Sequence, residues 1–187
     1  MKEQLKQMII DSIQTWTDKD IYVVSLYVYD DDDNPCKPTV TLGYNTETRY
    51  KEALKTSDEG EARWNFAVWL QNDLFCFGAD NDTAKVVKEW VIDQGFEYYD
   101  DFISDFDFDD DEADDYDDLT GAFIQVLIEI VRELHEEKVL TKKYGRELPI
   151  LIHELEYYDV IAEQNIEANG EDLVKDFSKW IYDMYIS

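Results

Sequence analysis

The sequence predicts an α+β domain in which a small, mainly antiparallel sheet packs against several amphipathic helices. Three observations lead to this fold class. The chain has 187 residues, the usual length of one domain, and 44% of them are hydrophobic, which is enough for a core. Helical periodicity covers most of the chain, whereas β-branched and aromatic runs fall mainly in its first half. Because no repeat or glycine- and proline-rich linker interrupts this pattern, we expect a single domain over residues 1–187.

The first 77 residues are expected to form a helix and three strands. The helix expected at 3–16 carries an apolar face made of Leu5, Met8, Ile9, Ile13 and Trp16. Residues 21–29 are mostly β-branched or aromatic, which is typical of a strand buried on both faces. After a turn at 30–35, the alternating residues 38–44 predict its antiparallel neighbour. Residues 74–77 predict a short third strand, and residues 61–70 fit a helix and a strand equally well.

The rest of the chain is predicted to be mainly helical. Helices are expected at 47–56, 83–94, 119–142, 158–167 and 170–185, with one more strand at 148–152. Asp82 is the expected N-cap of the helix at 83–94, and Gly95 is its expected C′ residue. The longest helix is expected to begin after Asp118 and to stop before Gly145. Asn169 is the expected N-cap of the last helix.

The net charge of the chain limits the classes of molecule that it can bind. It has 45 acidic and 17 basic residues, which gives a net charge of −28. Mass-to-area scaling gives a folded surface of about 9,000 Å², or roughly one net negative charge per 330 Å². Such a surface repels nucleic acids and anionic membranes, so we expect neither of them as a partner. It also opposes self-association, so we expect a monomer when the protein is free.

The sequence also indicates a cellular compartment. No run approaches the ~18 apolar residues of a membrane helix, and the first residues do not resemble a secretory signal. The two cysteines, Cys36 and Cys76, are interpreted as reduced thiols rather than as a disulfide. We therefore expect a cytoplasmic protein.

The most unusual stretch is an acidic insertion at residues 98–118, called the acidic segment below. Twelve of its 21 residues are acidic, and no lysine or arginine occurs from Glu89 to Val131. One interpretation is a mobile, solvated loop. However, a solvating spacer is usually poor in aromatic residues, and this one contains six tyrosines and phenylalanines. The second interpretation is a binding surface, whose carboxylates steer a basic partner while its rings anchor it. A cation site is the third.

The spacing of the acidic residues argues against a cation site, so a binding surface for a basic partner is the interpretation that we expect. Asp107, Asp109 and Asp111 match the first ligands of a calcium loop. Glu112 stands where that loop needs glycine, and Asp118 stands where it needs glutamate, so we expect no metal site. The expected partner-binding residues are Tyr98, Tyr99, Asp100, Asp101, Phe102, Asp105, Phe106, Asp107, Phe108, Asp109, Asp110, Asp111, Glu112, Asp114, Asp115, Tyr116, Asp117 and Asp118. A secondary patch is expected at residues 30–33, called the acidic turn below, and consists of Asp30, Asp31, Asp32 and Asp33.

Motifs for catalysis are missing from the sequence. His135 and His153 do not have the spacing of a zinc helix, and there is no Cys-x-x-Cys, glycine-rich phosphate loop or Gly-x-Ser-x-Gly. We therefore expect no cofactor and no enzymatic activity. The alternative is an enzyme that uses His153 with Glu154 or Glu156 as acid and base, and the competing interpretation of His153 is a structural histidine.

Two stretches resemble a bacterial family of domains of unknown function. One combines residues 43–47 (Gly-Tyr-Asn-Thr-Glu) with residues 62–72 (Ala-Arg-Trp-Asn-Phe-Ala-Val-Trp-Leu-Gln-Asn). The other is residues 144–159 (Tyr-Gly-Arg-Glu-Leu-Pro-Ile-Leu-Ile-His-Glu-Leu-Glu-Tyr-Tyr-Asp). The resemblance covers about residues 20 to 185. Members of that family often sit beside polymorphic or contact-dependent toxins, so the resemblance implies an immunity role without assigning catalytic residues.

Charge and resemblance lead to one functional hypothesis. A toxin that cleaves nucleic acid needs a basic cleft for its polyphosphate substrate, and a highly acidic protein can occupy that cleft. We therefore expect an immunity protein that neutralises a basic toxin, most simply a nuclease, by direct binding through its acidic and aromatic surface. The alternative from another class is a non-enzymatic acidic adaptor or cation-binding protein.

Overall fold

The computed structural model describes residues 1–79, 81–99 and 110–184, with the backbone alone at residues 81 and 110–118. Its helices are α1 (Lys2–Thr15), α2 (Glu47–Ala53), α3 (Glu59–Trp64), α4 (Asn81–Asp93), α5 (Asp110–Glu136), α6 (Val139–Tyr144), α7 (Asp159–Asn169) and α8 (Glu171–Met184). Its strands are β1 (Ile21–Asp30), β2 (Pro38–Thr46), β3 (Phe75–Phe77) and β4 (Ile150–His153). Two short 3₁₀ turns, η1 (Asp31–Asp33) and η2 (Phe66–Val68), complete the order. The predicted α+β class is confirmed.

The four strands form one mainly antiparallel sheet. Their order is β3-β2-β1-β4. β1 and β2 are antiparallel neighbours, with Tyr29 opposite Thr39, as the alternating pattern predicts. β3 pairs with β2 in the antiparallel sense, whereas β4 runs parallel to β1. β1 therefore lies inside the sheet between β2 and β4, which explains why its residues are apolar on both faces.

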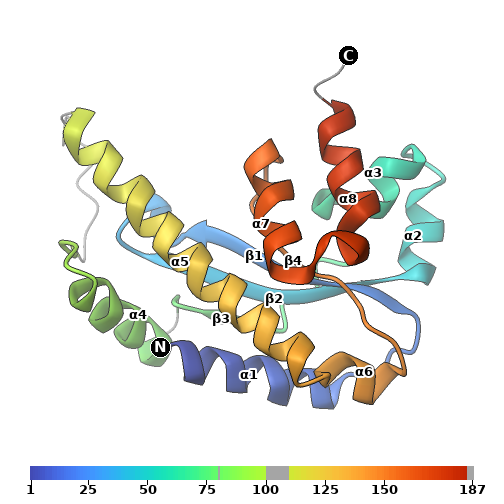
Figure 1. The fold of residues 1–187 in the computed structure, drawn as a ribbon, viewed down its shortest axis with the longest axis horizontal. Helices are drawn as coiled ribbons and strands as arrows, with labels where there is room; N and C mark the ends of the chain where they lie inside the picture. Colours follow the sequence, from blue (N-terminus) through green and yellow to red (C-terminus); the bar gives the residue numbers. More distant parts are fainter. Residues whose placement is uncertain (80, 100–109, 185–187) are drawn as a thin grey trace.

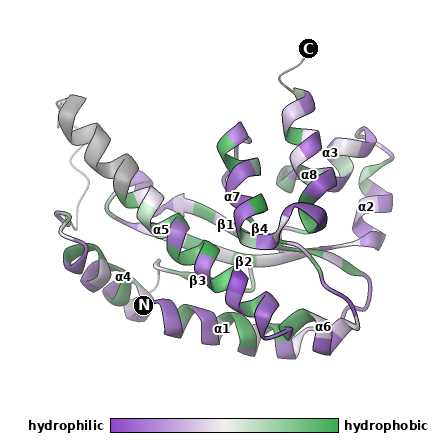
Figure 2. Ribbon diagram, in the orientation of Figure 1, coloured by the Kyte–Doolittle hydropathy of each residue, from purple (hydrophilic) through white to green (hydrophobic). Residues whose placement is uncertain are grey.

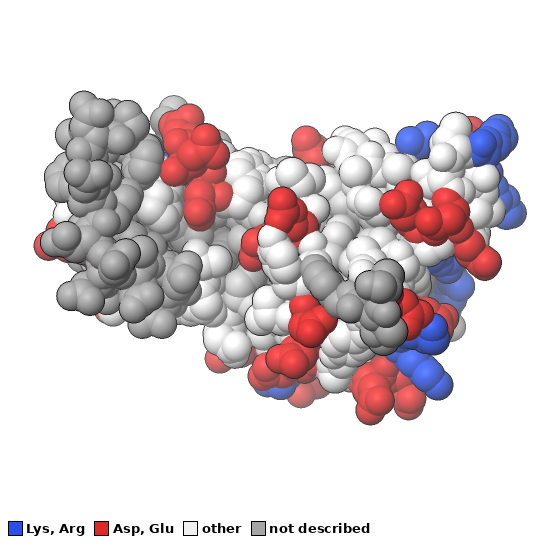
Figure 3. All heavy atoms as spheres, turned by 90° about the horizontal axis from the view of Figure 1, so that it is seen from above, with Lys and Arg blue, Asp and Glu red and all other residues white. Residues whose placement is uncertain are grey.

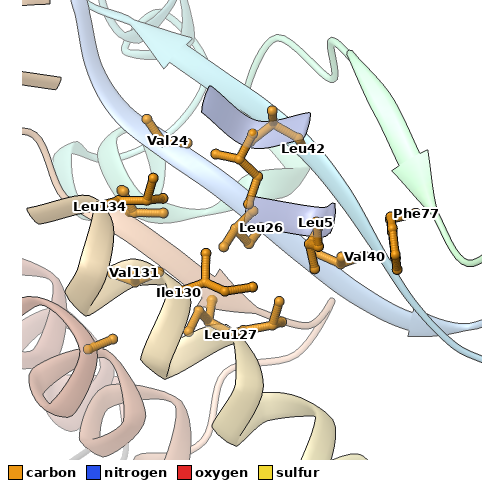
Figure 4. Packing of buried hydrophobic residues seen from close by; sticks show 14 of the residues in the cluster. Leu5, Val24, Leu26, Val40, Leu42, Phe77, Leu127, Ile130, Val131 and Leu134 are labelled. Carbon is orange, nitrogen blue, oxygen red and sulfur yellow. The ribbon is translucent and has the colours of Figure 1, made fainter. Parts of the chain in front are cut away.

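One face of the sheet packs against α1 and α5 (Figure 1). β1 contributes Val24, Leu26 and Val28, of which the first two have no exposed surface. Figure 4 shows residues of β1, β2 and β3 packed against Leu5 of α1 and against a row of α5 side chains, Leu127, Ile130, Val131 and Leu134. Hydrophobic and hydrophilic residues alternate along α1 and α5 (Figure 2), as expected for helices that cover a core on one side.

The opposite face packs against α3, α7 and α8. Val23 of β1 and Leu151 of β4 meet Phe177 and Ile181 of α8 in a second buried cluster. Trp64, at the end of α3, lies against Phe177 with ring centroids 5.7 Å apart. In Figure 1, α2, α3 and α8 stand together on this side of the sheet, near one of its ends.

The outer edge of β4 is closed by side chains of α7 rather than by another strand. The Asn165 amide accepts a hydrogen bond from the Ile152 N–H at 2.8 Å and donates one to the Ile152 carbonyl at 2.7 Å. Asn169 binds the N–H and the carbonyl of Ile150 in the same way, at 2.8 and 2.9 Å. Asn165 and Asn169 lie four residues apart on one face of α7, and they therefore pair with Ile152 and Ile150, which lie two residues apart on one side of β4.

Two predicted N-caps are wrong. Asn169 is the last residue of α7 and is occupied at the β4 edge, so it does not cap α8, which follows Gly170. α4 begins at Asn81, which places Asp82 inside the helix rather than at its N-cap. The expected C′ role of Gly95 is confirmed, because its φ is +93° and its N–H binds the Ile92 carbonyl at 3.0 Å.

The longest helix also has different ends from those predicted. α5 begins at Asp110, so the second half of the acidic segment is helical instead of belonging to a loop that ends at Asp118. Carboxylates near a helix N-terminus are favourable, because they oppose its positive end. At the other end, Lys138 adopts a φ of +55° and separates α5 from the short helix α6.

Candidate binding surface

The acidic turn lies at the end of the β1–β2 hairpin. Asp32 and Asp33 are exposed and have φ values of 56° and 55°, a left-handed conformation that aspartate tolerates better than most residues. Lys37 lies 3.9 Å from Asp32. Asp30 is half-buried, and its pKa is raised to about 6 by burial, then by the negative charges of Glu154 and Asp33.

One buried side chain joins the acidic turn to the start of the acidic segment. Asn34 is almost fully buried, and its amide donates a hydrogen bond to the Tyr99 carbonyl at 2.9 Å. Its oxygen accepts the Cys36 N–H at 3.0 Å, which fixes the side chain in place. The two patches predicted from sequence therefore meet at one end of the molecule at Tyr99, although 65 residues separate Asn34 from Tyr99.

The structure describes only part of the predicted primary patch. Tyr98 is half-buried against the core, with the Lys88 ammonium 4.5 Å from its ring, and Tyr99 is 44% exposed. Residues 110–118 form the first turns of α5. Residues 100–109 lie outside the described residues, as do the side chains of 110–118.

A pair of half-buried carboxylates adjoins the acidic turn. Glu154 follows β4, and burial raises its pKa. Burial, and after it the charge of Glu154, raises the pKa values of both Asp30 and Tyr27. Tyr27 stacks between Tyr29 and Phe66, with ring centroids 5.3 and 4.9 Å away. The sequence did not predict the link between Glu154 and β1. The alternation of residues along β1 does not show that its tyrosines adjoin the residue that follows β4.

Basic residues gather at the other end of the molecule. Figure 3 shows most of the visible lysines and arginines at the end where α2 and α3 lie in Figure 1. A hollow of about 500 Å³ lies there between α3 and α8. Its Arg63 is already occupied, since its guanidinium binds both Glu47 oxygens at 2.9 Å and lies 3.7 Å above the Tyr22 ring. On the face shown in Figure 3, the visible basic residues therefore lie mainly at one end.

His153, the candidate acid or base of the enzyme alternative, is enclosed. It has no exposed surface. Its Nδ1 donates to the Glu154 carbonyl at 3.0 Å, so the neutral ring accepts at Nε2 from the Ser25 hydroxyl at 2.8 Å. Burial lowers the pKa of His153 to about 4. Aromatic rings surround it, namely those of Tyr27, Phe66, Trp69 and Tyr157. This environment favours the structural interpretation.

The described part of the chain also bears on metal binding, thiols and membranes. Among the side chains that the structure describes, those of residues 1–79, 82–99 and 119–184, no group of three or more His, Cys, Asp or Glu residues is arranged to hold a metal ion. The calcium-loop spacing tested above falls in the part whose side chains are not described. Cys36 and Cys76 are both free thiols, as predicted. Among the helices described, none is long and apolar enough to cross a bilayer.

Comparisons of the chain with protein-family models, curated proteins and solved structures find no match. The resemblance of residues 43–47, 62–72 and 144–159 to a toxin-associated family therefore stays a prediction.

Proposed function

We propose that this protein is a cytoplasmic immunity protein that binds a basic bacterial toxin and blocks its active site. The observation that carries the proposal is the hydrogen bond from Asn34 to the Tyr99 carbonyl. Because of it, the acidic turn lies beside the first residues of the acidic segment. Sixteen acidic residues belong to these two stretches of the sequence, twelve in the segment and four in the turn.

A nuclease is the partner that best matches such a surface. Its substrate is a polyanion, so its active site carries clustered lysine and arginine side chains. An acidic end with few bases attracts that cleft over long distances and raises the association rate by about 10-fold to 1,000-fold at low salt. The exposed Tyr99 ring adds an amphipathic anchor of the kind that carries binding energy.

The experiment measures binding to the protein encoded immediately upstream, by calorimetry at low and high salt and by stopped-flow association. We expect tight binding that weakens steeply with salt. A variant in which Asp31, Asp32 and Asp33 are changed to asparagine should associate about tenfold more slowly, because charges at an interface rim act mainly on the association rate. It should protect cells that produce the toxin less well than the unchanged protein does.

The matched control removes three charges from the opposite end. Glu171→Gln, Asp172→Asn and Asp176→Asn change exposed residues of α8. We expect this triple variant to associate within about twofold of the unchanged protein, since its charges face away from the proposed interface. Equal effects of the two triple variants would show that net charge alone drives binding. An absence of binding at both salt concentrations would refute the immunity function and favour the acidic adaptor.

A further inference from the structure

A second surface on the same side of the molecule combines an apolar lining with unpaired carboxylates. It is a groove of about 320 Å³ between α5 and α7, called the α5–α7 groove below. Gly121 and Ile124 line it from α5, Val160 and Glu163 line it from α7, and Glu154, which follows β4, lines it as well.

Large apolar side chains are exposed at Val160 of the α5–α7 groove and at two residues that precede it in the chain. Val160, inside the groove, is 58% exposed. Leu155 is 64% exposed and Tyr158 is 48% exposed, and both belong to the loop that runs from β4 into α7. Single exposed apolar residues are common, whereas three within six residues, one of them lining a groove, form the kind of apolar surface that is found at interaction sites.

Two of the three carboxylates that line the groove form no ion pair within the described part of the chain. Glu167 is paired with Arg132 at 3.0 Å. Glu163 and Glu154 have no ion pair within the described part of the chain, and Glu154 is half-buried. Burying a carboxylate without a counter-charge is unfavourable, as the raised pKa of Glu154 reflects. A lysine or arginine from outside the molecule would supply the missing charge, while its aliphatic stem would cover the apolar lining.

We propose that the α5–α7 groove docks a basic, amphipathic segment of the partner protein. This proposal rests on the proposed function and deepens it by assigning a docking surface separate from the acidic turn. An apolar side chain of the segment packs between Ile124 and Val160, and its lysine or arginine pairs with Glu154 or Glu163. Charge complementarity selects this occupant, because a second copy of this chain would bring further carboxylates to the groove.

Gly121 allows the groove to be blocked without harming the fold. It lies in the helical part of α5, and a Cβ added to it would meet no atom within 4 Å. Gly121→Leu therefore places its side chain in the open groove and raises the helix propensity of α5. Gly121→Ala is the matched control, since it has the same effect on propensity and leaves most of the groove open.

The experiment uses the full ¹⁵N-labelled chain and two synthetic peptides of about 14 residues, long enough for roughly four helical turns. One peptide carries leucine and lysine at helical spacing, and the other has serine in place of every leucine and the same charge. We expect the leucine peptide to shift the amide signals of residues 120–125 and 154–164. Gly121→Leu should weaken its binding about tenfold, and Gly121→Ala should change it less than about twofold.

A charge-matched pair of variants tests the carboxylates. Changing Glu154 and Glu163 together to glutamine should weaken the binding of the leucine peptide about fivefold and reduce the salt dependence of that binding. Glu136→Gln with Glu147→Gln removes two exposed charges remote from the groove and should have little effect.

The outcomes separate this inference from the proposed function. Shifts confined to the acidic turn, or equal binding by the Gly121→Leu variant, would overturn the groove proposal and leave the immunity function standing. Groove shifts that occur with both peptides alike would also overturn it, because charge alone would then explain them. If the upstream-encoded protein fails to bind while the leucine peptide docks in the groove, the immunity function fails and the docking site stands.

Discussion

Replacing Asn165 tests whether side chains of α7 hold the free edge of the sheet. The Asn165 side chain makes three hydrogen bonds, to the Ile152 N–H at 2.8 Å, the Ile152 carbonyl at 2.7 Å and the Ile161 carbonyl at 2.8 Å. All of these groups are buried. Asn165→Leu keeps the approximate volume and removes all three bonds.

The expected loss in the free energy of unfolding depends on which buried groups lose their hydrogen-bond partners. The Ile152 carbonyl keeps a hydrogen bond from Gln164 at 2.9 Å, whereas the outward Ile152 N–H loses the partner that the structure gives it. A buried polar group left unpaired costs about 1–3 kcal/mol, and each lost neutral hydrogen bond adds about 1 kcal/mol. We expect Asn165→Leu to lower the free energy of unfolding by about 3 kcal/mol, a large part of the ~5–15 kcal/mol typical of a domain. Urea unfolding followed by circular dichroism measures it.

An aspartate at the same position adds a test by pH. Asn165→Asp keeps the acceptor that binds the Ile152 N–H but places a charge against two carbonyls. Burial raises the folded-state pKa of the introduced carboxyl above its unfolded value of about 3.9. Stability is therefore retained at low pH and lost as pH rises through the folded-state pKa, so the deficit should shrink between about pH 8 and pH 5. Asn65→Asp is the control, because Asn65 only accepts a hydrogen bond, from the Ala67 N–H at 2.9 Å, and a carboxylate can do the same. A loss below about 1 kcal/mol for both Asn165 variants would refute the role assigned to α7.

Two further predictions concern pH. The pKa of Asp30 is raised to about 6, so its contribution to stability is present at low pH and is lost as pH rises through about 6; Asp30→Asn should remove this loss in thermal unfolding curves recorded from about pH 4 to pH 8. The pKa of His153 is lowered from 6.5 to about 4, so its contribution is present above pH 6.5 and is lost as pH falls toward 4. His153→Gln should lower stability at neutral pH and flatten the acid side of the curve of unfolding free energy against pH, and an unchanged acid limb would contradict the enclosed, neutral imidazole.

Local sequence signals predicted most elements but not how the sheet ends. The run at 21–29 and the alternation at 38–44 correctly indicated β1 and β2. The alternation at 38–44 does not reflect burial on one face, because β2 is buried on both faces and Thr39 and Thr41 are buried polar residues. The role of Asn169 could not be read from the sequence. An asparagine before an amphipathic run is the usual sign of an N-cap, and only the parallel placement of β4 turns this residue into an edge partner.

The charge of the candidate surfaces could be predicted from the sequence, whereas the set of residues that the fold brings together at each surface could not. Acid clusters are visible in the sequence, so the acidic turn and the acidic segment were both expected. Their meeting depends on Asn34, whose partner is 65 residues away and is a backbone carbonyl that no motif marks. The α5–α7 groove was missed for the same reason, since Gly121 and Val160 come from separate helices that only the fold brings together.

Several unfavourable features of this protein lie at its acidic end. In contrast, the lysines of α1 are neutralised: Lys2 and Lys6 bind glutamates of α5, with Lys6 lying 2.6 Å from both Glu133 and Glu137. At the acidic end, two consecutive aspartates adopt left-handed backbone conformations, and Asp30 and Glu154 are half-buried carboxylates with raised pKa values. Each feature reduces the stability of the free protein. A basic partner would relieve the electrostatic part of this cost on binding, so the same residues that weaken the free fold would strengthen the complex.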